Sequence, residues 1–138
     1  MAQAKVTKTL ETTPDALWKC VEDFGNVGWL PGGGAGAEFE GSGPGMTRIL
    51  QGPDGKIRET LESVDANARS LTYVIPVGAP FPVTGYRATM QVSDDGGKGR
   101  LDWSCEFEPD GATADEARAA IESMYGVMLG WIQDYLSA

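Results

Sequence analysis

TADEARAAIESMYGVMLGWIQDYLSA, residues 113–138, is the stretch of sequence that decides the fold. Thr113 and Glu116 have the spacing of a capping box, so a helix is expected to begin between them. Apolar side chains then recur with helical spacing at Ala117, Ile121, Met124/Tyr125, Met128, Ile132 and Tyr135/Leu136. About 23 residues at about 1.5 Å each make a rod of roughly 35 Å, long enough to lie across a whole curved sheet.

The segment before this helix alternates between strand-like runs and turns. The expected strands cover Met46 to Gln51, Lys56 to Val64, Ser70 to Val77, Tyr86 to Val92 and Leu101 to Glu108. Turns rich in Gly, Pro and Asp separate several of them. Apolar and polar residues alternate along the last three strands, which predicts an antiparallel meander with one buried face and one wet face.

One further strand, Lys5 to Glu11, is expected to come first. Thr13-Pro14-Asp15 follows it and provides an N-cap, a proline at the first helical position and an early acid. A second short turn or helix is expected to lead up to Pro31, and glycine-rich loops surround the strand-like run Glu38-Phe39-Glu40. The expected order is one strand, two short helices, six strands and one long helix.

The composition indicates one globular domain covering residues 1–138. The chain is 41% hydrophobic and 22% charged, as expected for a single domain of this length. Its net charge of −9 repels phosphate backbones and anionic headgroups, so nucleic acids and membrane surfaces are poor candidate partners. Two cysteines are too few for a disulfide framework and no apolar leader is evident, so a cytoplasmic location without membrane insertion is expected.

The sequence contains no histidine, which removes several classes of site. A Ser-His-Asp or Cys-His nucleophile, a facial triad and an ordinary zinc site are all excluded. Proton chemistry would therefore have to use carboxylates, tyrosines, lysines, thiols or water. Neither a cofactor nor a metal is expected.

Glu59 stands out because it lies on an apolar strand face. In Ile57-Arg58-Glu59-Thr60-Leu61, alternation along a strand places Glu59 on the same side as Ile57 and Leu61. A buried carboxylate without a partner is costly, so this acid needs a charged partner, a proton or adjacent water. The last two possibilities indicate a cavity.

Arg48 is a candidate partner for Glu59. It shares parity with Leu50 on the expected neighbouring strand, so the two charged groups could meet inside. The pair would then be structural, or it would anchor the polar end of a ligand. A register shift of one residue would instead place Arg48 in solvent and Ile49 inside.

The order of elements resembles the helix-grip fold of the SRPBCC/START-like superfamily, an α+β fold in which a curved antiparallel sheet of about seven strands wraps around a long C-terminal helix. Local runs are similar to the bacterial polyketide cyclase/dehydrase and lipid-transport family. These runs are Gly45-Met46-Thr47-Arg48, residues 59–65 (ETLESVD), Ser70-Leu71-Thr72-Tyr73, residues 82–89 (PVTGYRAT) and Leu101-Asp102-Trp103. The resemblance covers nearly the whole chain, and the superfamily includes carriers, receptors and several kinds of enzyme.

The chain is also distantly similar to plant abscisic acid receptors. Residues 52–55 take the place of the receptors' gate loop and residues 79–83 that of their latch, while Glu59 and Tyr86 match a pocket acid and a pocket tyrosine. The resemblance implies that the two loops control entry to a cavity. Pro80-Phe81-Pro82 replaces the receptors' His-Arg-Leu latch, and glycines near Gly32 replace the lysine that anchors a ligand carboxylate, which argues against recognition of an acid.

The implied cavity would bind a small hydrophobic molecule, aromatic or polycyclic. Its expected lining residues are Arg48, Trp29, Phe39, Leu50, Ile75, Phe81, Met90, Trp103, Tyr125, Met128 and Ile132. Taken singly, each of these is explained equally well by core packing.

An enzyme is the alternative to a binding protein. It would be a cofactor-independent polyketide cyclase/dehydratase or lyase, with Glu59 as general acid or base and Tyr86 or Tyr73 donating a hydrogen bond to a developing enolate. Both hypotheses need the same pocket, and both are compatible with a monomer or a homodimer.

Overall fold

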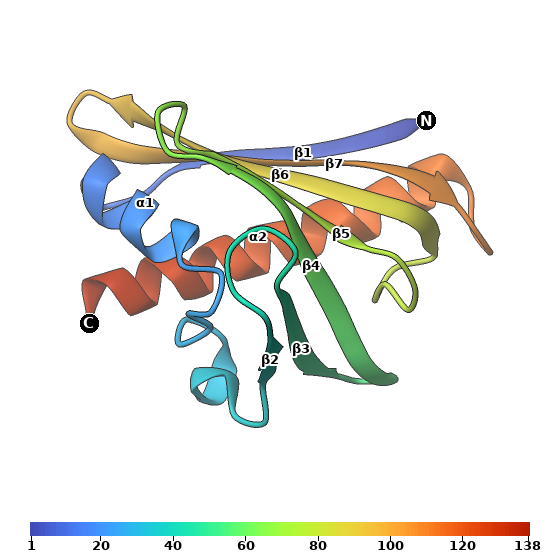
Figure 1. Ribbon diagram of the computed structural model, residues 1–138. Coiled ribbons are helices and arrows are strands. Elements are labelled where there is room, and N and C mark those ends of the chain that lie inside the picture. The colour runs from blue at the N-terminus through green and yellow to red at the C-terminus, as the bar shows by residue number, and fades with distance from the viewer.

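Seven antiparallel strands form one open sheet that bends around a long C-terminal helix (Figure 1). The computed structural model describes all residues, 1–138. The strands are β1 (Ala2–Thr9), β2 (Glu38–Glu40), β3 (Thr47–Gly52), β4 (Gly55–Asp65), β5 (Ser70–Ile75), β6 (Val83–Asp95) and β7 (Lys98–Pro109). They lie in the order β1-β7-β6-β5-β4-β3-β2. The expected α+β class and helix-grip arrangement are confirmed.

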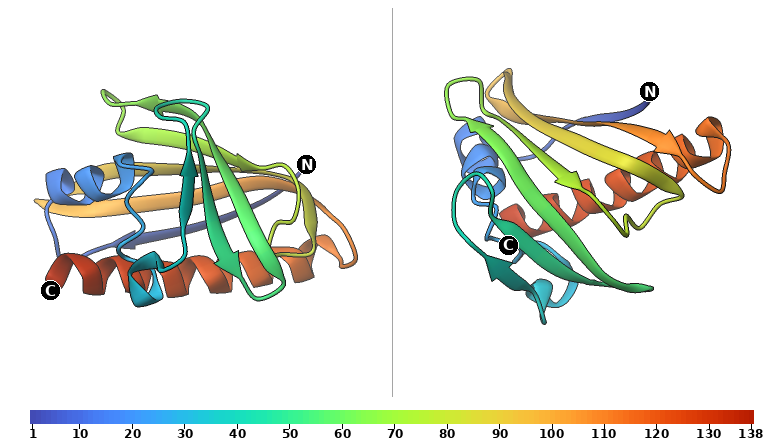
Figure 2. Two further views of the ribbon diagram at one scale, coloured as in Figure 1. Left: turned by 60° about the horizontal axis from the view of Figure 1, so that its bottom comes forward. Right: turned by 45° about the vertical axis from the view of Figure 1, so that its right-hand side comes forward.

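The long helix, α2 (Ala114–Ser137), lies under the sheet along most of its width (Figure 2). Its N-terminus carries the expected capping box, in which Glu116 N donates to Thr113 Oγ1 at 3.1 Å and Thr113 N donates to Glu116 Oε1 at 2.9 Å. β1 and β7 run alongside α2, whereas β3 and β4 cross it steeply (Figure 2). The change in strand direction wraps the sheet around the helix.

One short helix, rather than two, follows β1. This helix, α1 (Pro14–Glu22), begins at the expected N-cap, where Thr13 Oγ1 accepts a hydrogen bond from Ala16 N at 3.1 Å. The second expected helix is only a 3-10 turn at Pro31–Gly34. Gly32 and Gly33 have φ values of 67° and 68°, in the left-handed region, so a right-handed helix cannot continue there.

Most of the expected strands differ from the observed ones by one to three residues at an end, and β6 extends three residues further at each end. β1 covers Ala2–Thr9 rather than Lys5 to Glu11, and β5 ends at Ile75 rather than Val77. Pro76 has no amide hydrogen to continue the ladder, and Val77 beyond it is 83% exposed.

The core lies between the concave face of the sheet and α2. Alternate residues of β5, β6 and β7 point into it as expected, including Leu71, Tyr73, Ile75, Ala88, Met90, Trp103 and Phe107. The helix contributes a buried row of Ala117, Ile121, Tyr125, Leu129 and Ile132. The row therefore passes through Leu129 and not through Met128, and Tyr135 is 42% exposed.

Two irregularities bend the sheet. The β4–β5 register shifts between Leu61 and Ser63, and the β6–β7 register shifts between Thr84 and Arg87. Bulges of this kind sharpen strand bending and re-aim side chains. The second shift contains Gly85, whose φ of 62° favours glycine, and places Tyr86 opposite Ile75 on the buried face.

Neither helix combines the length and the apolar character that crossing a membrane would require.

Candidate functional site

A cavity of about 470 Å³ lies between the sheet and α2. Twelve of its 19 lining residues are hydrophobic. The lining consists of Leu30, Pro31, Gly34, Ala35, Ala37, Leu50, Gln51, Gly52, Pro53, Ile57, Glu59, Tyr73, Ile75, Pro80, Phe81, Tyr86, Met124, Met128 and Trp131. Its size lies in the range of about 300–1,000 Å³ that is usual for small-molecule sites.

The helix presents a separate row of side chains to this cavity. Met124, Met128 and Trp131 follow one another at helical spacing and line the cavity, next to the row that fills the core. Methionine side chains adapt to differently shaped neighbours, and a tryptophan offers a large flat apolar surface. One flank of α2 therefore forms an apolar wall.

Glu59 lies in the cavity wall and forms an ion pair with Arg48. The two residues are direct cross-strand partners on β3 and β4, and Arg48 Nε donates to Glu59 Oε1 at 2.6 Å. The Glu59 side chain is 12% exposed and that of Arg48 is 6% exposed. Glu59 Oε2 has no hydrogen-bond partner in the protein. Every fully buried polar side-chain atom does have a partner, so Oε2 is not fully buried. This oxygen is therefore accessible from the cavity.

Arg48 is held behind the cavity wall. Its NH1 donates to the Phe24 carbonyl oxygen at 3.4 Å, and its guanidinium lies 3.9 Å from the centroid of the Phe24 ring. A cation over an aromatic face is attracted by the ring quadrupole. Arg48 is absent from the lining, so it orients Glu59 instead of facing a ligand.

Three tyrosine hydroxyl groups form a buried network beside Glu59. Tyr86 bonds to Tyr125, the Tyr73 and Tyr86 hydroxyl oxygens lie 3.4 Å apart, and Trp103 Nε1 donates to the Tyr73 hydroxyl at 3.2 Å. Burial raises the pKa of Tyr73, and the nearby Glu59 charge raises it further. Burial likewise raises the pKa values of Tyr86 and Tyr125. These hydroxyl groups therefore stay protonated at physiological pH.

Half of the residues proposed from the sequence line this cavity. They are Glu59, Tyr73, Tyr86, Leu50, Ile75, Phe81 and Met128. Arg48 lies one layer behind, paired to Glu59. The other proposed residues do not face the cavity: Trp29, Met90, Trp103, Tyr125 and Ile132 are buried in the core, and Phe39 is 44% exposed on the edge strand β2.

Core packing explains these differences. The Trp29 and Trp103 rings meet edge to face, and Trp103 stacks on Tyr125 with ring centroids 4.6 Å apart. These aromatic contacts fill the space between β7 and α2. The cavity lies instead under β3, β4 and β5 and reaches Tyr86 near the start of β6.

The loops form the remaining walls and were only partly anticipated. Gly52 and Pro53 of the gate-like turn, and Pro80 and Phe81 of the latch-like loop, line the cavity as the resemblance implied. The segment from Leu30 to Ala37 also lines it, in the region where glycines replace the receptors' ligand-anchoring lysine. Gln51 Nε2 donates to the Gly36 carbonyl at 3.2 Å and ties this segment to β3.

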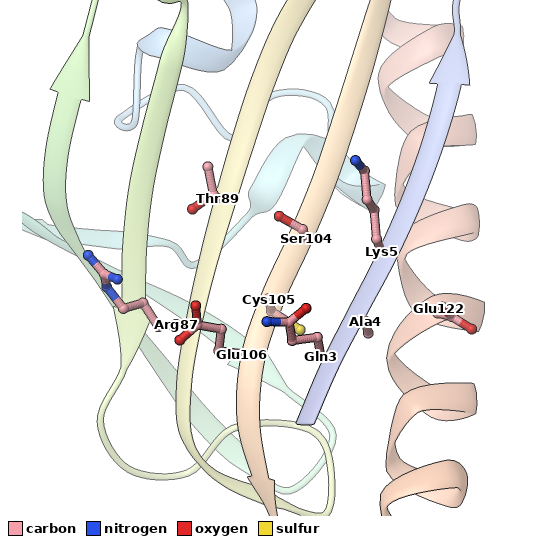
Figure 3. Close-up of a pocket in the computed structure, with 9 residues that line it drawn as sticks. All are labelled: Gln3, Ala4, Lys5, Arg87, Thr89, Ser104, Cys105, Glu106 and Glu122. Carbon is pink, nitrogen blue, oxygen red and sulfur yellow. The ribbon is translucent and has the colours of Figure 1, made fainter. Parts of the chain in front are cut away.

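A second hollow, of about 350 Å³, lies on the outer face of the sheet (Figure 3). Gln3, Glu106 and Arg87 form one row across β1, β7 and β6, and Lys5, Ser104 and Thr89 form the next. Only two of its nine lining residues are hydrophobic. A hollow lined mainly by polar and charged side chains provides little apolar contact for a hydrophobic molecule, so the inner cavity is the stronger candidate.

The inner cavity can hold an apolar molecule and accept a hydrogen bond from it. Glu59 Oε2 provides the acceptor, while Tyr73 and Tyr86 add neutral hydroxyl groups. No group of three or more His, Cys, Asp or Glu side chains is placed to hold a metal ion.

The fold is shared with solved structures from bacteria and from a plant. An uncharacterised protein from Bacillus thuringiensis is 26% identical with a TM-score of 0.81, covering 99% of this chain and 100% of that one. A Thermobifida fusca protein is 25% identical with a TM-score of 0.82, covering 99% and 93% of the two chains. A point mutant of norcoclaurine synthase from Thalictrum flavum, in complex with a transition-state analogue, is 18% identical with a TM-score of 0.77, covering 97% and 92%.

The sequence itself identifies the family. No curated protein matches the chain. The family model described as polyketide cyclase / dehydrase and lipid transport matches residues 1–136, nearly the whole chain. The chain therefore belongs to the polyketide cyclase/dehydrase and lipid-transport family, within the helix-grip superfamily.

Proposed function

We propose that this protein binds a small, largely apolar molecule in the cavity between the sheet and α2. The observation that carries the proposal is the lining: an apolar wall that contains one accessible carboxylate oxygen. Apolar surface supplies the affinity of such sites, and a few polar groups fix the orientation of the ligand. The family description is consistent with this, since polyketides and lipids are both largely apolar.

Filling the cavity tests the proposal. Met128→Trp adds a large side chain to the helical wall, so we expect the Kd of the neutral fluorescent probe N-phenyl-naphthylamine to rise by about tenfold or more, equivalent to a loss of about 1.4 kcal/mol. Fluorescence titration measures this Kd directly. Val127→Trp is the matched control, because Val127 is the neighbouring residue on α2 and is 47% exposed.

Two results would remove the proposal. One is a wild-type protein that fails to bind the probe. The other is a Met128→Trp variant that binds as tightly as Val127→Trp, which would place the bound probe outside this cavity.

A second candidate is a cofactor-independent cyclase, dehydratase or lyase. It is favoured by one observation: Glu59 and the Tyr73 and Tyr86 side chains line the same cavity. Glu59 would move a proton, and a neutral tyrosine would donate a hydrogen bond to the developing enolate oxygen. The Arg48 ion pair weakens this candidate, because Arg48 already occupies one oxygen of the carboxylate that would have to move the proton. Catalysis predicts that Glu59→Gln abolishes turnover of a bound substrate while leaving its binding in place.

A further inference from the structure

We infer that the ligand presents a protonated amine to Glu59 and that carboxylic acids are excluded from the cavity. The inference rests on the proposed function, since it names the chemical class of the molecule that the cavity binds. Four features of the cavity carry it.

The first feature is the sign of the charge in the lining. Glu59 is the only charged residue among the 19 that line the cavity, and no lysine or arginine is among them. A ligand carboxylate would meet no cationic partner there and would lie close to another carboxylate. Burial of an unpaired anion beside a like charge is strongly unfavourable.

The second feature is the orientation of the ion pair. Arg48 binds Glu59 Oε1 from behind and contacts the Phe24 carbonyl and ring, while Glu59 Oε2 remains unbonded. The pair therefore turns its negative end toward the cavity. A positively charged donor is the complementary group, because hydrogen bonds between two charged partners are the stronger kind.

The third feature is the shortage of donors elsewhere in the wall. Two hydrogen bonds among the Tyr73, Tyr86 and Tyr125 hydroxyl groups use two of their three protons. Gln51, the other polar residue nearby, uses one of its two Nε2 hydrogens on the Gly36 carbonyl. An anionic ligand would need several donors, and the side chains of the wall have few to give.

The fourth feature favours cations over neutral donors. The rings of Tyr73, Phe81, Tyr86 and Trp131 line the cavity, and aromatic faces attract cations. The net charge of −9 also raises the local concentration of cationic ligands around the protein. Both effects add to the direct attraction of Glu59.

A matched series of probes tests the inference. Naphthylethylamine, naphthylethanol and naphthylpropionate share one ring system and one linker and differ in the terminal group. We expect isothermal titration calorimetry to give the tightest Kd for the amine, with the alcohol next, and a carboxylate Kd at least about tenfold weaker than that of the amine.

Neutralising Glu59 tests whether this residue causes the preference for the amine over the carboxylate. Glu59→Gln should reduce the ratio between the carboxylate and amine Kd values by about tenfold. Glu62→Gln is the control: it makes the same change on the same strand, but Glu62 is on the outer face, where its Oε1 accepts from Arg87 Nε at 2.9 Å. This control should keep the wild-type ratio.

The possible outcomes separate the two proposals. Equal binding of all three probes, or tightest binding of the carboxylate, would overturn the amine inference and leave the binding function standing. Failure of all three to bind would overturn both. An equal loss of preference in Glu62→Gln would show that general surface charge, and not Glu59, sets the ranking. If Glu59→Gln failed to fold, the wild-type ranking alone would still decide the inference.

Discussion

Arg48 and Glu59 form the most deeply buried ion pair of the molecule, and it lies where a ligand would meet the protein. Such a pair contributes little net stability compared with apolar residues, because both charges lose water. Its value lies in orientation: Arg48 fixes one carboxylate oxygen, which leaves the other directed at the cavity. The pair therefore acts as a fixed polar anchor. Removing one partner should lower the free energy of unfolding.

Removing Arg48 alone tests that cost. Arg48→Met should lower the free energy of unfolding by about 3 kcal/mol, because Glu59 loses its partner and the Phe24 carbonyl and ring lose the guanidinium. Urea denaturation measures the change. Arg58→Met provides the control, since Arg58 pairs with Glu40 on the outer face with both side chains more than half exposed, and it should cost less than about 1 kcal/mol. Equal losses in the two variants would show that the buried pair has no special role.

Alternation along the strands predicted the inward side chains well. Glu59, Tyr73 and Tyr86 all line the cavity, as period-two alternation indicated. Alternation could not decide which of Arg48 and Ile49 is the buried residue, and the structure shows that burial does not distinguish them. Both residues are buried, at 5% and 2% exposed, although they alternate along β3, with Arg48 opposite Glu59 and Ile49 opposite Arg58.

At the scale of elements, α2 serves two purposes with two neighbouring rows of side chains. One row fills the core and the other, Met124, Met128 and Trp131, lines the cavity. Helical periodicity identified an apolar stripe but could not separate these rows. The two rows are offset by one residue, about 100° around the helix, and both are apolar. The separation depends on how far each part of the sheet stands from the helix, which is a tertiary property.

The same helix contains glycines that packing does not require. A Cβ atom added at Gly126 would meet no heavy atom within 4 Å. Gly126→Ala should therefore raise the free energy of unfolding by about 0.8–1 kcal/mol, the intrinsic difference between the two residues in a helix. Thermal or urea unfolding measures this, and binding of an apolar probe should not change.

A glycine in the sheet provides the contrast. At Gly99 in β7, an added Cβ would lie 2.9 Å from Leu17 Cδ2 and 3.0 Å from the Thr13 carbonyl oxygen. Gly99→Ala should therefore destabilise the protein by forcing α1 away from the sheet. Stabilisation by Gly99→Ala, or destabilisation by Gly126→Ala, would contradict this account of the two positions.

At the scale of the molecule, the cavity exists because distant segments of the chain converge at one end of the sheet. Lining residues come from β3 to β6, from α2, from residues 30–37, and from the turns near Pro53 and Phe81. The resemblance to gated relatives anticipated the two turns. It pointed to the segment 30–37 only through the glycines near Gly32 that replace the receptors' lysine, because a glycine-rich loop without periodicity gives little sequence signal of what it covers.

Phe81 is the largest apolar side chain of the loop between β5 and β6, and it is the best candidate for a barrier to exchange. It lines the cavity and packs on Tyr86 with ring centroids 5.8 Å apart. Truncation by Phe81→Ala removes apolar contact worth about 1.5–3 kcal/mol when fully buried, so we expect a bound apolar probe to dissociate about tenfold faster or more. Stopped-flow displacement measures this rate. Val77→Ala is the control in the same loop, because Val77 is 83% exposed and does not line the cavity. An unchanged rate in Phe81→Ala, or equal acceleration in both variants, would show that the ligand leaves by another path, with the segment 30–37 as the next wall to test.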